Sequence, residues 1–390
     1  MPLMTDPHFL GYARANGSAG VRNHLLVLSV AGLTGPAARR VAQALPGARL
    51  VTMPYGGGLI GDDHALHMRA LTGLACNPNV GAVLLIGSDP PKLRTLAQAV
   101  EARGTPMASV CLDDCDHDSL SLSDRAIRAG ARLHRELSRQ RRVPLPLSQL
   151  FVGLECGRSD PSSGIVANPL IGRLTDAVIG HGGSAVFGET LEWLGAEHLL
   201  ARRAATPAVA EAVRQAVLRR EALATRQGVD LLGNNPGPTN IAAGLSTIEE
   251  KSLGAIAKSG TAPIAGVLAY AEAPAEKGLY AMDAPAYSPE SLTGFVAAGA
   301  QLLLFSTGVG NSYVSLLAPT IKLSANPQAT QRLHEQLDFD ASAVLRGDRT
   351  PDDAARELLE LLVDVASGSL TWGEVLGEGE EVVSRLGEAL

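Results

Sequence analysis

The chain has 390 residues, a formal net charge of -7 and 46% hydrophobic residues. This length suits two domains, and the hydrophobic content is enough for a large buried core. The acidic balance, with one basic cluster at residues 139–142, argues against a nucleic-acid partner. No signal segment opens the sequence, and no apolar run approaches the ~20 residues that span a bilayer. Four cysteines without a framework spacing indicate reduced thiols, so we expect a cytoplasmic protein without a membrane partner.

The first part of the chain alternates apolar runs with helix patterns. It opens with the Gly- and Asn-rich run GYARANGSAGVRN, which predicts a loop over residues 1–23 with Arg14 and Arg22 as its cations. Four strand-then-helix units follow, and such alternation gives a parallel, doubly wound sheet. The expected strands are His24–Val30, Ala48–Met53, Ala82–Ile86 and Pro106–Cys111, and the expected helices are Gly35–Leu45, Asp62–Leu74, Lys92–Ala102 and Leu120–Arg141.

The second part is less regular. The helix that ends in ELSRQRR runs into VPLPLSQ, a Pro-broken linker, which places a domain boundary near residue 145. We therefore expect a Rossmann-like α/β domain over 1–145 and a larger, irregular α/β domain over 146–390. The elements expected in the latter are strands at Leu150–Leu154, Ser184–Phe187, Ile264–Tyr270 and Gln301–Phe305, a long helix near Pro207–Gln227, and two acidic amphipathic helices at Pro351–Gly368 and Thr371–Leu390, a surface cap or oligomer contact.

The stretch Gly153–Gly172, GLECGRSDPSSGIVANPLIG, is rich in groups that carry chemistry. It places Glu155, Cys156, Ser159 and Asp160 directly after an apolar run and before helix-spaced apolar residues. In open α/β sheets such a loop lies at the carboxyl end of a strand, where ligands bind, and its glycines let the backbone approach a ligand. An ordinary Asp/Ser/Pro-rich turn with a helix cap explains the same pattern.

Two further acidic stretches are candidates. Glu189 follows an expected strand and Glu192 comes three residues later, so the pair could hold a divalent cation or act as acid and base. The first turn of a helix, where acids are favoured, is the alternative. Glu249 or Glu250 after Ser246 or Thr247 has the shape of a capping box, and Lys251 beside these acids could serve as a base if burial lowered its pKa.

Three other motifs favour structural interpretations. Gly56–Gly61 satisfies G-x-G-x-x-G, but it follows the second strand, so a Gly-rich turn lining a small-anion site fits better than a dinucleotide site. His64 and His67 could share a helix face and a metal, although such pairs are more often solvated. Cys111, Cys115 and His117 match no zinc spacing. From the residues alone, we expect an α/β enzyme that binds a small acidic ligand in Gly-rich loops.

Several of these stretches together resemble the altronate/galactarate dehydratase family, which includes the large subunit of sulfolactate sulfo-lyase. They follow the family's order over nearly the whole chain. The matching pieces are GYARANGSAGVRN, GLECGRSDPSSGIVANPLIG, GETLEWLGAEHLLARRA, NNPGPTNIAAGLSTIEEKSLGAIAKSG, KGLYAMDAP, LTGFVAAGAQLLLFSTGVGN and PTIKLSAN.

The resemblance implies a lyase that removes water or sulfite from a hydroxy acid. It implies α-proton abstraction, enediolate stabilisation and a divalent metal, ferrous iron or Mg²⁺. It also implies a small hydroxy-acid substrate, a separate small subunit with an SAF-like domain, and a homo-oligomer. The site residues it implies are Glu155, Cys156, Asp160 and Lys251 for catalysis, Arg14, Arg22, Asn23, Ser159, Asn168, Thr307 and Lys322 for substrate binding, and Glu189 and Glu192 for the metal.

Five loops depart from the pattern that the resemblance implies. Metal-type or cationic residues are replaced in each of them, so we expect either a lyase with a changed, less anionic substrate or a silent paralogue that binds a small acid or pairs with an active subunit. The departures are Tyr55–Ile60 for a His-Gly-x-Gly-Cys-Gly loop, Gly87-Ser88-Asp89 for Gly-Cys-Glu, Val30–Leu33 for a Cys-containing loop, Ile241 for a Lys and Val309 for an Arg.

Overall fold

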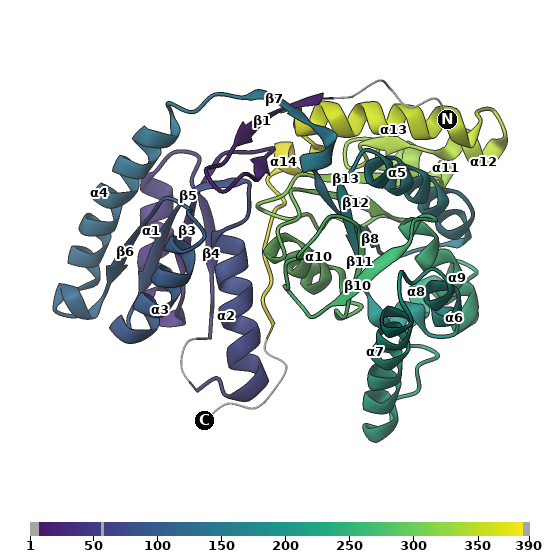
Figure 1. Cartoon of the computed structure of the whole chain (residues 1–390), viewed down its shortest axis with the longest axis horizontal. Coiled ribbons are helices and arrows are strands. Elements are labelled where there is room, and N and C mark those ends of the chain that lie inside the picture. The colour runs from purple at the N-terminus through teal and green to yellow at the C-terminus, as the bar shows by residue number, and fades with distance from the viewer. Residues whose placement is uncertain (1–7, 56–57, 385–390) are drawn as a thin grey trace.

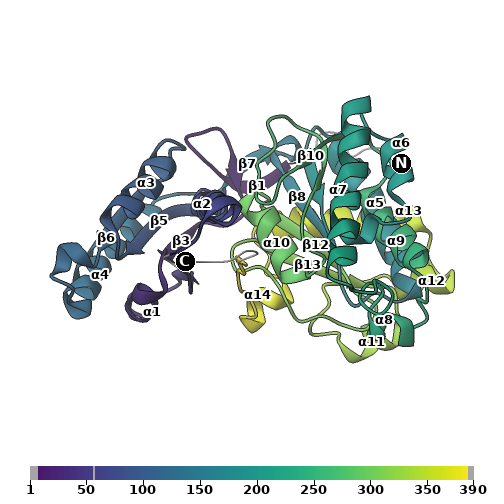
Figure 2. The same cartoon turned by 90° about the horizontal axis from the view of Figure 1, so that it is seen from below.

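The computed structural model describes residues 8–55 and 58–384. Two units stand side by side, each built on a parallel β-sheet, and the views in Figures 1 and 2 both separate them. The first unit (purple to blue) carries a four-stranded sheet and the second (teal to yellow) a seven-stranded sheet.

The four-stranded sheet is parallel and covered on both faces. Its strands are β3 (His24–Ser29), β4 (Arg49–Thr52), β5 (Val80–Gly87) and β6 (Met107–Cys111), in the order β4-β3-β5-β6. Along β3, Leu25 and Val27 pack against one set of helices while Leu26 and Leu28 pack against the other, as the period of two requires. The helices are α1 (Gly35–Ala44) and α4 (Ser119–Leu137) on one face, and α2 (Gly61–Ala75) and α3 (Pro90–Glu101) on the other.

These elements confirm the expected fold class for this part of the chain. All four predicted strands and all four predicted helices are present, with ends that shift by a few residues. The apolar runs were a reliable signal because strands covered on both faces cannot tolerate polar side chains.

A small antiparallel sheet corrects two expectations. The supposed N-terminal loop contains β1 (His8–Ala13) and β2 (Ala19–Gly20), and the supposed linker contains β7 (Val143–Pro146). β1 lies in the middle and pairs with both. Prolines 144 and 146 are tolerated because β7 is an edge strand. The chain therefore enters and leaves the first unit through paired strands.

The seven-stranded sheet is parallel throughout. Its strands are β8 (Phe151–Cys156), β9 (Ser184–Phe187), β10 (Ile264–Leu268), β11 (Leu279–Met282), β12 (Leu302–Ser306), β13 (Thr320–Ser324) and β14 (Phe339–Asp340), in the order β10-β11-β9-β8-β12-β13-β14. From β8 the chain passes to β9, then to the edge strand β10, and returns to β11 between them, whereas from β12 it proceeds outward to β13 and β14. The carboxyl ends of β8 and β12 therefore flank a topological switch point, the usual position for a ligand site.

Helices cover both faces of this larger sheet. On one face lie α5 (Asn168–Gly180), α7 (Pro207–Arg226) and α13 (Pro351–Ala366). On the other lies α10 (Ser288–Ala297), which also packs against α2 of the first unit, so one apolar core joins the units. The remaining helices are α6 (Glu197–Arg202), α8 (Pro238–Ala242), α9 (Ile248–Ile256), α11 (Pro327–Arg332), α12 (Ser342–Arg346) and α14 (Trp372–Leu376). Within the described residues, no helix combines the length and apolar character that crossing a membrane requires.

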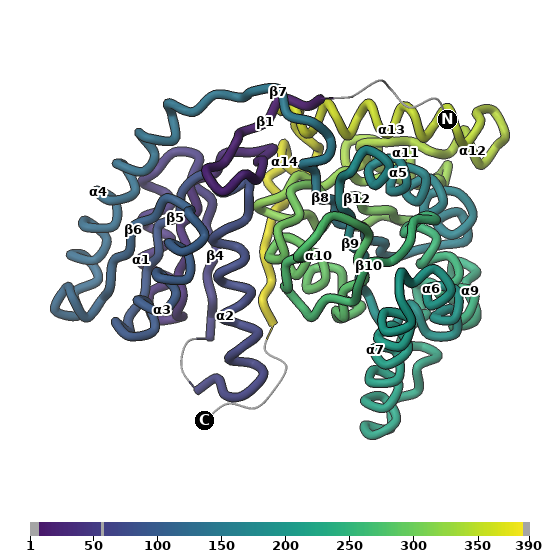
Figure 3. The backbone as a smooth tube through the Cα atoms, viewed as in Figure 1, coloured from purple at the N-terminus to yellow at the C-terminus, as the bar shows by residue number. Residues whose placement is uncertain are grey.

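The predicted helix over Thr371–Leu390 is wrong for most of its described part. Only α14 forms, and it ends at Gly377, which adopts a left-handed conformation. The segment 378–384 then runs between α2 and α10, as Figure 3 traces. The buried Glu381 carboxylate accepts hydrogen bonds from the backbone N–H groups of Leu316 and Leu317, which hold the segment extended. Residues 385–390 lie outside the described part.

Candidate active site

The end of β8 delivers two buried reactive side chains. Glu155 and Cys156 are its last two residues, and both are fully buried. Glu155 Oε2 accepts a hydrogen bond from Ser291 of α10, whereas its Oε1 has no hydrogen-bond partner among the described residues. The adjoining loop contains a second buried orphan, Ser159 Oγ. Buried polar atoms without partners are costly, so a ligand group that hydrogen-bonded to these two atoms would be favoured.

A tight turn after β9 delivers two more carboxylates. Glu189 has the left-handed backbone φ of 61° and precedes a 3₁₀ turn that contains Glu192. Such a conformation costs a non-glycine residue about 1–3 kcal/mol and is concentrated at functional sites. The Trp193 indole packs against Phe187 and donates to the Gly188 carbonyl at 2.8 Å, which fixes the turn. Glu192 therefore lies in the first turn of a short 3₁₀ helix, as the alternative expected, and both carboxylates are also buried.

Two lysines complete the cluster. The predicted capping box is present, with Thr247 as the cap of α9, and it positions Lys251 so that its Nζ lies 2.5 Å from Glu192 Oε1. Lys258 lies just beyond α9, and its Nζ donates to Glu189 Oε2 at 2.6 Å and to Cys156 Sγ at 3.1 Å. Sequence reasoning missed Lys258, although it follows Lys251 by two helical turns and so shares its face.

The pKa values of Glu155 and Glu189 are shifted in opposite directions. Burial raises the pKa of Glu155 well above its usual range, and the neighbouring charge of Glu189 adds to this effect. Burial alone would also raise the pKa of Glu189, but the Lys258 ammonium outweighs it and the pKa ends below its usual value. The cluster thus contains a neutral acid next to an ionised carboxylate, the arrangement that proton transfer requires.

The other groups of the cluster are also shifted. Burial, with the charge of Glu189, raises the pKa of Cys156 to about 12, which keeps its thiol protonated. Burial would lower the pKa values of both lysines, but the surrounding carboxylates reverse the effect and raise them. Both lysines therefore remain cations in the interior. The expectation that a depressed pKa makes Lys251 a base is wrong for this arrangement.

Cys156, Glu189 and Glu192 offer three ligand atoms within 4.8 Å of one another, the one such group among the described residues. Carboxylate oxygens and a thiol sulfur suit a divalent transition metal, so the donor set fits the metal that the family resemblance implies. Each carboxylate already has an ammonium group at 2.5–2.6 Å. A cation at these atoms would compete with Lys251 and Lys258.

Four other predicted residues frame the cluster. Asp160 accepts hydrogen bonds from Ser162 and Asn326, and thereby ties the β8 loop to the loop after β13. Asn168 accepts a bond from Ser306 at the end of β12 and donates to Gly254 of α9. Ser159 lies in the same loop as Asp160, and Thr307, directly after β12, accepts the N–H of Gly310.

The remaining predicted residues lie elsewhere. Arg14 bonds to Asn23 and to the Pro78 carbonyl, inside the first unit. Arg22 forms a buried ion pair with Glu374, and Lys322 pairs with Glu378. The hydrogen bonds of these four predicted residues connect parts of the fold and do not reach the Cys156 cluster. We therefore leave Arg14, Arg22, Asn23 and Lys322 out of the proposed chemistry.

The minor motifs have different outcomes: the cysteine motif keeps its structural interpretation, whereas the histidine pair is not solvated as a whole, since His64 is exposed and His67 is buried. All four cysteines of the chain are free. Cys111 and Cys115 are buried while the His117 side chain is 76% exposed, so they do not converge. His67 is buried against Tyr55, and it belongs to no metal-ligating group among the described residues. The G-x-G-x-x-G motif falls partly on residues 56–57, outside the described part.

The comparisons with known proteins identify the family of the chain. Residues 147–389 match the family described as D-galactarate/Altronate dehydratase, C-terminal, and residues 11–138 match D-galactarate dehydratase/Altronate hydrolase, second domain. The chain belongs to the D-galactarate/altronate dehydratase family. The (2R)-sulfolactate sulfo-lyase subunit beta of Chromohalobacter salexigens is 39% identical over 98% of each chain. The altronate dehydratases of Bacillus subtilis and Escherichia coli are 32% and 33% identical over 93% of this chain and 74% of theirs.

These matches confirm the family resemblance and place this member of the dehydratase family among the lyases. Two of its altered loops, Val30–Leu33 and Gly87-Ser88-Asp89, meet at one place in the first unit. With Pro54 they line a cavity of about 500 Å³, whose charged lining residues are Asp89 and Lys92. Of the other departures, the described residues Tyr55, Ile241 and Val309 are not among those that line it.

Proposed function

We propose that the chain is a lyase that eliminates water, or a similar β-substituent, from a small hydroxy carboxylic acid. One observation carries this proposal: at the carboxyl ends of β8 and β9, two buried ammonium groups pair with the Glu189 and Glu192 carboxylates, and Glu155 lies beside them as a neutral acid. Elimination next to a carboxylate needs these parts, because negative charge develops on the substrate carboxylate while a proton leaves the α carbon.

The proposed roles follow from the contacts. Glu189 is the base that takes the α proton, since it is ionised and is held in a strained turn. Lys251 and Lys258 stabilise the charge that develops on the substrate carboxylate. Glu155, the neutral acid beside Glu189, supplies a proton to the departing group. A divalent metal held by Cys156, Glu189 and Glu192 would supply Lewis-acid stabilisation of the same charge.

Access to the cluster involves the segment 229–247. Its Asn240 side chain donates to the Ser159 carbonyl at 2.8 Å, and its Asn235 side chain to the Leu191 carbonyl at 3.5 Å. It thus contacts both loops that carry the cluster. Because Glu189 and Cys156 are buried, substrate entry requires this segment or its neighbours to move.

The test is turnover by the purified chain over a panel of hydroxy acids, with sugar acids, (2R)-sulfolactate and less anionic 2,3-dihydroxy acids represented. Each is assayed with and without added Fe²⁺ or Mg²⁺, and with and without a small subunit. We expect an enol-derived oxo acid or pyruvate-type product from at least one of them. Binding of an acid without turnover under any of these conditions would instead support a silent paralogue that acts by binding or by pairing with an active subunit.

A further inference from the structure

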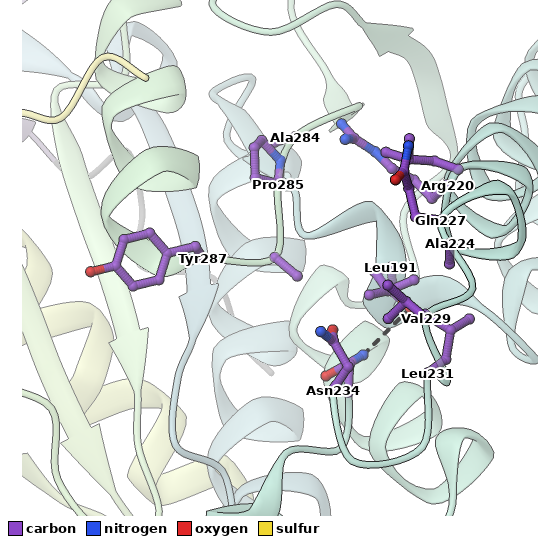
Figure 4. Close-up of a pocket in the computed structure, with 13 residues that line it drawn as sticks. Leu191, Arg220, Ala224, Gln227, Val229, Leu231, Asn234, Ala284, Pro285 and Tyr287 are labelled. Carbon is purple, nitrogen blue, oxygen red and sulfur yellow. Dashed lines mark hydrogen bonds between the residues drawn. The ribbon is translucent and has the colours of Figure 1, made fainter. Parts of the chain in front are cut away.

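A second cavity lies on the outer side of the turn that carries Glu189 and Glu192. It has a volume of about 620 Å³, within the range of ligand pockets. Its walls are the last turns of α7, the segment that follows α7, the loop after β11 and Leu191 of the turn itself. Figure 4 shows Leu191, Val229 and Leu231 gathered together, with Arg220 and Gln227 to one side.

The lining is apolar with one positive end. Aliphatic side chains dominate it, and no acidic side chain is among the described residues that line it. Several of these aliphatic groups face solvent: Leu223 is 45% exposed and Val229 is 46% exposed. When an apolar ligand covers exposed side chains of this kind, their removal from water stabilises the complex.

An arginine excess supplies the positive charge. Arg219 and Arg220 both form ion pairs with the single carboxylate of Asp283, at 3.0 Å each. The two guanidinium groups share that carboxylate, and burial raises the pKa of Glu290, the other acidic group near Arg220, which favours its neutral form. Arg220 donates to Asp283 through Nε and Nη2, so an anionic head group would bind at its remaining nitrogen, Nη1.

We propose that this cavity binds a small organic monocarboxylate through an apolar body of about four to eight carbons. The carboxylate lies at Arg220, and the apolar body covers Leu191, Leu223 and Val229. Binding at this site is argued from the cavity alone and stands whether or not the proposed lyase activity is found. It also reaches the active site, because Leu191 lies between the two glutamates and Thr190 donates to Asp283, the partner of Arg220.

Calorimetric titration of the full chain with butyrate, hexanoate, octanoate, hexanol and hexylammonium tests the proposal. We expect affinity to rise about fourfold with each added methylene. Hexanoate should bind more tightly than hexanol, and hexylammonium most weakly. Equal affinities across the series, or no heat for octanoate, would overturn it.

Matched variants locate the ligand. Ala224→Trp fills the cavity and should abolish hexanoate binding, whereas Leu218→Trp, at a 50% exposed position of α7 outside the lining, should not. Arg220→Gln should remove the preference for hexanoate over hexanol, whereas Arg214→Gln, whose partner is Glu211, should keep it. Unchanged binding in both Ala224→Trp and Arg220→Gln would place the acid elsewhere and overturn the proposal.

The acid bound here is separate from the lyase's own substrate, because the one carboxylate of a monocarboxylate cannot lie both at Arg220 and at Lys251 and Lys258. Failure of turnover alone therefore contradicts only the proposed function, while failure of hexanoate binding contradicts only this inference.

Discussion

Both parallel sheets place loops at the carboxyl ends of their strands, which we call the edge of each sheet, but the side chains in these loops differ. At the first sheet, the loops after β3, β4 and β5 enclose a cavity of about 500 Å³ in which Asp89 and Lys92 are the charged lining residues. At the second, the loops after β8 and β9 bury a thiol, carboxyl groups and two ammonium groups around Cys156. The topology of each sheet therefore brings loops together at one position, and the side chains in those loops decide whether an active site forms there.

The difference explains what the altered loops change. Ser88-Asp89 and Val30–Leu33 stand where the family resemblance led us to expect thiol and carboxylate ligands. At the second sheet the Cys156 cluster is present, but Ile241 and Val309 stand where the resemblance led us to expect a Lys and an Arg. A lyase that keeps this cluster and changes the loops around it is expected to keep the proton-transfer chemistry and change the acid it accepts.

The largest effect should come from replacing one carboxylate at each edge. Glu189→Gln removes the proposed base and is expected to lower turnover about 10³-fold, a typical loss for general-base catalysis. Asp89→Asn keeps the α3 cap that Asp89 forms with the Lys92 N–H and should leave turnover within about twofold. Steady-state rates on the best acid of the panel measure both. Equal losses would mean that the two edges act together.

A second comparison removes one lysine from each edge. Lys258→Met leaves Glu189 buried without its ammonium partner and should lower the free energy of unfolding by about 3–5 kcal/mol. Added Mn²⁺ or Mg²⁺ should raise the melting temperature of this variant more than that of the wild type, because Lys258 no longer competes for Glu189 and Cys156. The control is Lys92→Met, which we expect to change stability by less than about 0.5 kcal/mol. A Lys258→Met protein insensitive to metal would show that the three donors form no metal site.

The segment between the units should respond to pH. Burial raises the pKa of Glu381 from 4.5 to about 7, so the folded state holds a proton that the unfolded chain has lost. Its contribution to stability is complete below pH 4.5 and is lost as pH rises through 7. The free energy of unfolding should therefore fall by about 3 kcal/mol across this window.

Denaturant titrations of wild type and Glu381→Gln at several pH values measure this slope. Glutamine can still accept the N–H groups of Leu316 and Leu317, so the variant should fold and lose the pH dependence between 4.5 and 7. Glu380→Gln, at an exposed neighbouring position, is the control and should retain the wild-type slope. If Glu381→Gln kept the wild-type pH dependence of the free energy of unfolding, that dependence would belong to another group.

The smallest effect concerns the contact between the units. A Cβ on Gly73 of α2 would lie 2.0 Å from the Ala297 carbonyl of α10, so Gly73→Val should cost about 1–3 kcal/mol. Because α10 also carries Ser291, the partner of Glu155, turnover should fall modestly as well. Gly180→Ala, at a helical position with open space around it, should be neutral or slightly stabilising. A Gly73→Val protein with wild-type stability and turnover would show that the first unit does not support the active site.

Much of the fold could be predicted because its strands are buried on both faces. The runs at β3, β5, β8 and β9 are apolar for that reason and were found. β11 and β13 were missed because Tyr280 and Lys322 interrupt their apolar pattern. β1 was missed because its alternation of buried and exposed residues lies next to a Gly-rich turn, so the whole stretch was predicted to be a loop. The amphipathic pattern after Thr371 misled the prediction, since Gly377 and the bonds to Glu381 hold those residues extended.

The site was predictable where one loop carried several groups. Glu155 with Cys156, and Glu189 with Glu192, were expected near strand ends, and the structure brings them together with Lys251. Lys258 and Ser291 could not be placed because their distances to the cluster depend on how α9 and α10 pack. Arg14 and Arg22 were chosen by charge alone, and charge does not tell a substrate contact from a buried ion pair such as Arg22 with Glu374.

The shared core between the units has a consequence for the order of folding. The first sheet uses residues up to 111 and is closed by α4, so during synthesis its strands can pair early through local contacts. The apolar side of α2 must wait for α10: the Asn77 side chain after α2 bonds to the Val296 carbonyl, 219 residues further on. The apolar side of α2 in the nascent first unit therefore stays uncovered until α10 has been synthesised, and such exposed surface favours aggregation during synthesis.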